Sequence, residues 1–189
     1  MEVDLVIEEE KRYFFRDPVL RFWVAYTGQG MEVDAFPRRE DLEALVGDLS
    51  ERFQRVSTQL GRAKESEVRE FLRKLAGQTV DGALLGQKES MHVPDFSRVE
   101  RYVSPDGQVE LDALAEAGTE RWVVEVKWRL KRVGKGELEH LLGLAEQFEA
   151  KAWCISQAGF TPEAVTFAGE HGVLVSGADD LRVLSKLAA

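Results

Sequence analysis

Two apolar segments joined by a short polar connection constrain the fold of this chain most strongly. Residues 109–115 and 122–128 are rich in valine, leucine, alanine and tryptophan, and residues 116–120 between them include a glycine. This pattern predicts a β-hairpin. Charged side chains nevertheless stand inside both strands, where apolar ones are usual. These residues are Asp112 in the first strand and Glu125 and Lys127 in the second.

The three charged residues form a candidate catalytic and metal-binding group. Glu125 and Lys127 are two positions apart in a strand, so they project from the same face. If Asp112 faces them across the hairpin, two carboxylates and one ammonium group meet. Neighbouring carboxylates repel each other unless a cation lies between them, and such oxygen ligands suit Mg²⁺ or Mn²⁺. The hairpin therefore predicts a site for metal-assisted hydrolysis of a phosphodiester.

The same charges also fit a simpler structure, an amphipathic hairpin with its polar face in water. Glu110, Asp112, Glu125 and Lys127 would then form ordinary cross-strand ion pairs, which stabilise a sheet only slightly. The two interpretations differ in whether further catalytic groups are expected nearby. The rest of the sequence favours the first.

A charged helix is predicted ahead of the hairpin, over residues 61–72. Glu65, Val68 and Leu72 fall at positions i, i+3 and i+7, which place Glu65 on a partly apolar stripe that faces the core. The other glutamates of this helix are expected to face solvent. Glu65 is therefore a further candidate for the site.

The remaining sequence predicts alternating helices and strands. Apolar residues at helical spacing predict a helix over 137–150, and a strand is expected over 152–156. Thr161 is predicted to cap the next helix, with Pro162 at its first position. An apolar strand over 172–176 follows. The order helix, strand, strand, helix, strand, helix, strand predicts an α/β fold.

An aspartate, twelve intervening residues and then Glu-Val-Lys in an apolar strand resemble the motif of the PD-(D/E)xK, or restriction-endonuclease-like, nucleases. The resemblance implies a mixed central sheet flanked by helices. It also implies that Asp112 and Glu125 bind Mg²⁺ (or Mn²⁺), with the main-chain carbonyl of Val126 completing the coordination. Lys127 would orient water or stabilise developing charge. Glu65 matches the helix glutamate of the family and would hold a second metal ion or a water.

A second resemblance lies near the N-terminus. Residues 13–23 contain the pattern Tyr-x-x-x-Asp-Pro-x-x-Arg-Phe-Trp, which resembles the junction between a winged helix and a C-terminal nuclease-like domain in archaeal-type AAA ATPases. No Gly-x-x-x-x-Gly-Lys-Ser/Thr motif is present, so the ATPase part is absent. Apolar stripes at helical spacing predict helices between residues 17 and 60, and so a mainly helical N-terminal region over 1–60. The resemblance implies that this region holds the remnant of a winged helix and precedes a nuclease-like domain over 61–189.

Composition limits the partners and the compartment. The net charge of −9 argues against nucleic-acid binding over the whole surface, although residues 129–135 form a dense basic cluster just after the hairpin. No apolar run is long enough to span a membrane, so no membrane partner is expected. The single cysteine, Cys154, cannot form an internal disulfide. We therefore expect a reducing, cytoplasmic environment.

Three functions follow from these observations. The first is a metal-dependent nuclease, with DNA as the expected nucleic acid. The second is a nuclease-fold module that binds nucleic acid or a partner ATPase without cutting. The third is a toxin or defence component whose ATPase partner is encoded separately. Apolar content in residues 1–60 also allows homodimerisation. The intact trio of Asp112, Glu125 and Lys127 favours the enzyme.

Overall fold

The structure is a computed structural model that describes residues 6–9, 12–15 and 61–187. The chain divides into two compact units, Met1–Leu60 and Gly61–Ala189. In the first unit, strand β1 (Val6–Glu9) pairs antiparallel with β2 (Arg12–Phe15). The helices predicted between residues 17 and 60 lie outside the described residues. The helical character and winged-helix origin of this region therefore stay predictions.

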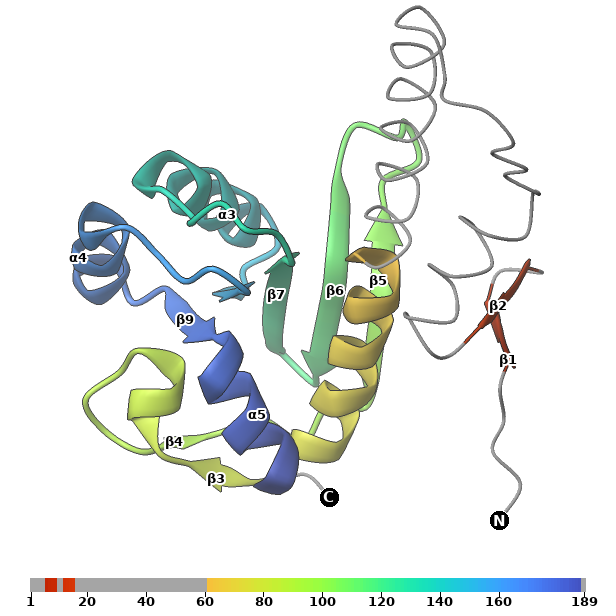
Figure 1. The fold of residues 1–189 in the computed structure, drawn as a ribbon, viewed down its shortest axis with the longest axis horizontal. Coiled ribbons are helices and arrows are strands. Elements are labelled where there is room, and N and C mark those ends of the chain that lie inside the picture. Colours follow the sequence, from red (N-terminus) through yellow and green to blue (C-terminus); the bar gives the residue numbers. More distant parts are fainter. Residues whose placement is uncertain (1–5, 10–11, 16–60, 188–189) are drawn as a thin grey trace, which may run out of the picture. The chain divides into compact units, whose positions relative to one another are not determined.

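A five-stranded sheet with the order β5-β6-β7-β8-β9 forms the centre of the second unit (Figure 1). The strands are β5 (Arg98–Val103), β6 (Glu110–Ala117), β7 (Glu120–Lys127), β8 (Lys151–Ser156) and β9 (Leu174–Gly177). Antiparallel pairing joins β5, β6 and β7, and parallel pairing joins β7, β8 and β9. The mixed sheet that the sequence predicted is confirmed.

Helices cover both faces of this sheet (Figure 1). On one face, α3 (Lys135–Gln147) and α4 (Pro162–His171) bury Leu138 and Phe167 against the strands. On the other face, a helix over residues 61–75 and α5 (Ala178–Leu187) bury Leu72 and Leu184. The strands are therefore apolar on both sides, which is typical of parallel and mixed sheets in α/β proteins. No helix in the described part of the chain is long and apolar enough to cross a membrane.

A short irregular segment connects the 61–75 helix to the sheet. Strand β3 (Thr79–Val80) pairs antiparallel with β4 (Met91–His92), and a 3₁₀ turn, η1 (Gly82–Leu85), lies between them. Gly86 ends this turn in the left-handed region, at φ 69°, and lies against Val175 of β9. The turn is thereby fixed onto the sheet.

The predicted hairpin forms, with longer strands and a tighter turn than expected. Most of the polar connection over 116–120 belongs to the strands, which leaves only Gly118 and Thr119 between β6 and β7. Gly118 takes a φ of 61°, which glycine adopts without steric cost. The predicted cap of α4 is confirmed, since the Thr161 side chain accepts a hydrogen bond from the Ala164 N–H and Pro162 begins the helix.

We expect Gly86→Ala to destabilise the second unit by about 2 kcal/mol. A residue with a Cβ is strained in the left-handed backbone conformation of this position, and the added methyl group would also overpack the core. A Cβ at this position would lie 2.4 Å from Cγ2 of Val175. Urea unfolding measures the change. Gly143→Ala in α3 is the control, since it meets no atom within 4 Å and should stabilise the helix slightly. Equal stability of both variants would contradict the close packing at Gly86.

Candidate active site

Asp112 lies where β6 and β7 separate. The register of the two strands runs from Ala117 paired with Glu120 to Ala113 paired with Val124, and so stops one residue short of Asp112. On the other side of β6, the register with β5 shifts by one residue in the same stretch, which marks a β-bulge. Oδ2 of Asp112 accepts a hydrogen bond of 2.7 Å from the Val126 N–H. The carboxylate thus takes the position of a main-chain acceptor at the fork.

The carbonyl of Val126 is directed to the same fork. In an extended strand, the N–H and C=O of one residue point to the same neighbouring strand. The Val126 N–H donates to Asp112 of β6, whereas the carbonyl of Lys127 accepts from Gln157 N, at 3.1 Å, on the opposite side of β7. The Val126 carbonyl therefore faces the β6 side, close to the Asp112 carboxylate.

Glu125 and Lys127 form an ion pair beside the fork, as their shared face predicts. Their side chains are 21% and 29% exposed, so solvent reaches the pair while screening it only in part. Burial lowers the pKa of Lys127. The hydrogen bond and charge of Glu125, together with the charge of Asp112, outweigh that effect and raise the pKa above its usual value. Lys127 is therefore a protonated, positively charged group at neutral pH.

The carboxylate of Asp112 is held in an unfavourable environment. Burial is the main cause, and the negative charges of Glu125 and Glu65 add to it, against the hydrogen bond from Val126 and the charge of Lys127. Together they raise the pKa of Asp112 to about 7. The raised pKa of Asp112 thus reflects burial first and the neighbouring carboxylates second.

Glu65 contributes to the same field from the 61–75 helix. Val68 and Leu72 are buried, and Glu65 lies on their stripe, partly buried. Burial raises the pKa of Glu65, and the charges of Glu110 and Glu125 raise it further, whereas Arg69 lowers it. One turn along the helix, Nη1 of Arg69 donates a hydrogen bond of 2.8 Å to the main-chain oxygen of Asp112.

The structure thus brings the four predicted residues, Asp112, Glu125, Lys127 and Glu65, into one electrostatic environment. It does not bring three acidic ligands together. Among the described residues, no group of three or more His, Cys, Asp or Glu side chains is arranged to hold a metal ion. A metal ion at the fork would therefore rest on the two carboxylates of Asp112 and Glu125 and on the Val126 carbonyl.

Two contacts around the site were not predicted from the sequence, those of Arg69 and Lys64. Arg69 fixes the helix to β6 at the fork, and its spacing of four from Glu65 was the available signal. Lys64 lies over the ring of Trp128, 4.3 Å from its centroid, and also forms an ion pair with Glu67. Since Trp128 directly follows β7, this cation–π contact connects the start of the helix to the end of β7.

A cysteine nucleophile receives no support from the structure. Cys154 is buried in β8, where it pairs with Glu125 across the parallel ladder. Burial, with a smaller contribution from the charge of Glu125, raises the pKa of its thiol to about 12. The thiol is protonated at physiological pH and packs as a small apolar side chain.

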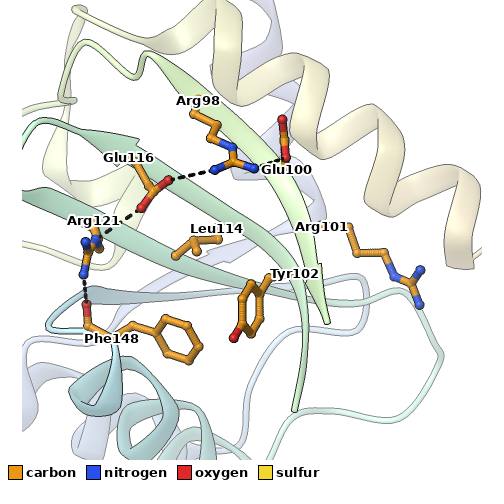
Figure 2. A pocket seen from close by; sticks show the side chains of 8 residues that line it. All are labelled: Arg98, Glu100, Arg101, Tyr102, Leu114, Glu116, Arg121 and Phe148. Carbon is orange, nitrogen blue, oxygen red and sulfur yellow. Dashed lines mark hydrogen bonds and ion pairs between the residues drawn. The ribbon is translucent and has the colours of Figure 1, made fainter. Parts of the chain in front are cut away.

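A pocket of about 330 Å³ lies elsewhere, over β5, β6 and the start of β7 (Figure 2). It is lined by Arg98, Glu100, Arg101, Tyr102, Leu114, Glu116, Arg121 and Phe148. Glu116 bridges Arg98 and Arg121, and the Arg101 side chain points away from these residues (Figure 2). Arg101 instead pairs with Glu110. The acidic and basic side chains of the pocket therefore largely compensate each other.

The family model described as restriction endonuclease matches residues 88–184, just over half of the chain. The chain belongs to this restriction endonuclease family. Asp112, Glu125, Val126 and Lys127 lie within the matched region, and Glu65 lies outside it. The predicted restriction-endonuclease-like fold is therefore confirmed. The resemblance to the C-terminal domain of AAA ATPases stays a prediction.

Other comparisons add little about this restriction endonuclease family member. No curated protein matches it. Among solved structures it is similar to the crystal structure of a protein of unknown function, AF1548, with 18% identity and a TM-score of 0.42. The match covers 60% of this chain and 56% of that one. A likeness this distant carries no argument about activity.

We expect Asp112→Asn to make the protein more stable at pH 8 and to leave its stability unchanged near pH 4. Because the folded pKa of about 7 lies above the ordinary value of 3.8, the charged form is disfavoured by folding. Wild-type stability should therefore fall as pH rises from about 4 to 7. The asparagine amide oxygen still accepts from Val126 and carries no charge, so a gain of at least ~1 kcal/mol is expected.

Urea unfolding at several pH values between 4 and 8 measures this difference. Asp179→Asn on α5 is the matched control, because its carboxylate is 89% exposed and its removal should change stability little at any pH. A loss of stability in Asp112→Asn at pH 8 would show instead that the fold requires the negative charge at the fork.

Proposed function

We propose that this protein is a metal-dependent nuclease that hydrolyses phosphodiester bonds of nucleic acid, with DNA as its substrate. One observation carries the proposal: a partly buried, electrostatically disfavoured carboxylate, Asp112, lies with Glu125 and Lys127 at a fork between two strands. Membership of the restriction endonuclease family supports the same chemistry. Natural proteins retain such costly charges mainly at functional sites.

The donor set at the fork fits Mg²⁺ or Mn²⁺. Two carboxylates and a main-chain carbonyl are hard oxygen ligands, and these cations bind them in preference to nitrogen or sulfur. The fit also follows from charge, since the negative charge of Glu125 disfavours the ionised form of Asp112 and a divalent cation would offset that repulsion. When bound, the ion would polarise a phosphate oxygen and make water a stronger nucleophile.

The protein's own residues supply orientation and positive charge. The Val126 N–H fixes the rotation of the Asp112 carboxylate through Oδ2, so Oδ1 keeps a defined direction. Lys127 is protonated, and its ammonium group can position water or stabilise the negative charge that develops on a phosphate in the transition state. Its contact with Glu125 must loosen when either partner engages the substrate.

Glu65 is the least direct of the proposed residues. It reaches the fork from the helix, and it influences Asp112 through charge. We assign it to a water or a second cation. Its removal is expected to slow the reaction less than removal of Asp112 or Glu125.

A nuclease-fold module that binds nucleic acid without cutting is the second candidate function. It is favoured by the absence of a three-ligand acidic group among the described residues, and by the Glu125–Lys127 ion pair. In such a module Lys127 would neutralise Glu125 in place of a cation. A partner ATPase, a homodimer, a defence role and a cytoplasmic location stay predictions of the sequence.

We expect Asp112→Asn and Glu125→Gln each to reduce DNA cleavage at least ~100-fold, because both remove oxygen ligands from the reacting centre. Lys127→Ala should cause a loss of similar size, and Glu65→Gln a loss of about tenfold. Cleavage of plasmid and linear duplexes with Mg²⁺ or Mn²⁺ measures these effects. Glu120→Gln is the control because it alters an exposed glutamate at the far end of β7.

If Asp112→Asn cleaved DNA as fast as the wild type, the assignment of the fork as the catalytic site would be wrong. Retained binding of DNA with no cleavage by the wild type, at any divalent cation, would favour the non-cutting module. A larger loss in Glu65→Gln than in Asp112→Asn would reverse the two assignments.

Cation binding itself provides a prediction that does not depend on cleavage. At about 100 times its Kd, Mg²⁺ or Mn²⁺ should stabilise the wild type by roughly 2.7 kcal/mol. Asp112→Asn should lose this stabilisation, and Lys127→Ala should keep it because it frees Glu125 from its ion pair. Thermal unfolding with and without the cation, together with calorimetry, measures the effect. Equal stabilisation of wild type and Asp112→Asn would place the cation elsewhere.

A further inference from the structure

The loop that follows β7 presents an exposed apolar side chain, Leu130. Leu130 comes three residues after Lys127 and is 92% exposed. The next most exposed large apolar side chain among the described residues, Val165, is 53% exposed. Single exposed apolar residues are common on protein surfaces. Leu130 differs in being almost fully exposed and in its position beside the candidate active site.

The base of this loop is fixed on both sides. The Arg129 N–H donates to the carbonyl of Lys127 at 3.1 Å, and the Arg129 side chain forms an ion pair with Glu137. At the other end, Val133 is buried and exchanges main-chain hydrogen bonds of 3.0 Å with Gly159 and Thr161. Only residues 130–132 project from this base, so the loop forms a short protrusion with a defined position.

Two cations flank the apolar tip. Lys131 and Arg132 are exposed, and neither has an ion-pair partner within the part of the chain that the structure describes. Elsewhere in this part, most arginines pair with nearby carboxylates. In a chain with a net charge of −9, unpaired cations beside an exposed leucine mark a local surface for an anionic partner.

We propose that Leu130 is a wedge that inserts between stacked base pairs of duplex DNA, while Lys131 and Arg132 contact the phosphates beside the opened step. The combination of an apolar tip and flanking cations fits the apolar base faces and anionic backbone of a duplex, and proteins that kink DNA use leucine in this way. The inference rests on the proposed function for its placement of DNA at the fork.

The reach of the loop brings the wedge close to the reacting phosphate. Three residues of extended chain span at most about 11 Å, so the backbone at Leu130 lies within roughly three base steps of that at Lys127. Unstacking at this distance would kink the duplex next to the fork. The substrate class is therefore duplex DNA with an easily deformed step, such as a pyrimidine–purine step or a mismatch, where unstacking costs least.

Base unstacking by the full chain can be followed with duplexes that carry 2-aminopurine, whose fluorescence rises when it is unstacked. Ca²⁺ replaces Mg²⁺ so that the duplex stays uncut. The wild type should raise the fluorescence and should prefer a duplex with one mismatch. Leu130→Ala should lose most of the fluorescence rise and bind about tenfold more weakly. Leu187→Ala is the matched control, since Leu187 is an exposed leucine (52%) at the end of α5, outside the 130–132 loop.

The flanking cations give an independent result. Lys131→Gln and Arg132→Gln should each weaken binding for all sequences and reduce the slope of log K against log salt by about one, while saturating protein still unstacks the probe. Wild-type fluorescence and affinity in Leu130→Ala would overturn the wedge. So would Leu130-dependent binding to anionic vesicles without any unstacking of DNA, since that result assigns the loop to a membrane surface.

The wedge and the nuclease activity can fail separately. Cleavage that survives in Leu130→Ala, with no unstacking by the wild type, would leave the nuclease and remove the wedge. Leu130-dependent unstacking by a wild type that never cleaves would keep the wedge and remove the nuclease. A wild type that binds no duplex at all would overturn both.

Discussion

The hydrogen bond between the Asp112 carboxylate and the Val126 N–H is the contact on which the candidate site depends. It ends the β6–β7 ladder, because the Val126 N–H donates to a side-chain oxygen of Asp112 and not to a main-chain carbonyl of β6. Continued pairing would have covered the Val126 carbonyl and placed Asp112 directly opposite Glu125 as an ordinary cross-strand pair. The fork thus exists because one strand residue replaces a ladder hydrogen bond with its own side chain, at the position of a bulge.

This arrangement lowers the stability of the folded state, and the surrounding core offsets the loss. Asp112 is partly buried near other carboxylates, and its raised pKa of about 7 means that folding at neutral pH favours the protonated form. Both faces of the sheet are packed, with Trp153 and Leu174 on one side and Leu138 and Ala152 on the other. The strands are therefore held rigidly enough for an electrostatically unfavourable group to stay in place.

Local patterns predicted the parts of this protein whose structure is determined by neighbouring residues. The hairpin, the Thr161 cap and the buried stripe of Val68 and Leu72 follow from periodicity and capping chemistry alone. Strand β5 was missed because Arg-Val-Glu-Arg-Tyr-Val places charges at an exposed sheet edge, where the apolar signal disappears. Helix α5 was missed because it begins directly after β9, with no turn between the two elements. Its cap is the Asp180 carboxylate, which accepts a hydrogen bond from the main-chain N–H of Gly177.

The candidate site was predicted in composition and only partly in geometry. The spacing of Asp112, Glu125 and Lys127 follows from the sequence, whereas the fork itself depends on a bulge and on a register that no local pattern encodes. Likewise, the sequence places Glu65 on an inward stripe, but the contact of Arg69 with the main chain of Asp112 requires residues 43 positions apart to meet. Contacts of this kind depend on tertiary packing, which outweighs local propensity.

The distribution of charge explains how an acidic protein can present a site for a polyanion. At physiological ionic strength, charges act over a distance of about 8 Å, so a phosphate experiences its immediate surroundings rather than the net charge of −9. At the fork those surroundings include the carboxylates of Asp112, Glu125 and Glu65, which repel phosphate, and the Lys127 ammonium group, which is paired with Glu125. Lys131 and Arg132, a few residues beyond the fork, attract it. A divalent cation at the fork would offset the repulsion between these carboxylates and phosphate. Approach of the nucleic-acid backbone to the fork therefore depends on cation binding, whereas its contact with Lys131 and Arg132 does not.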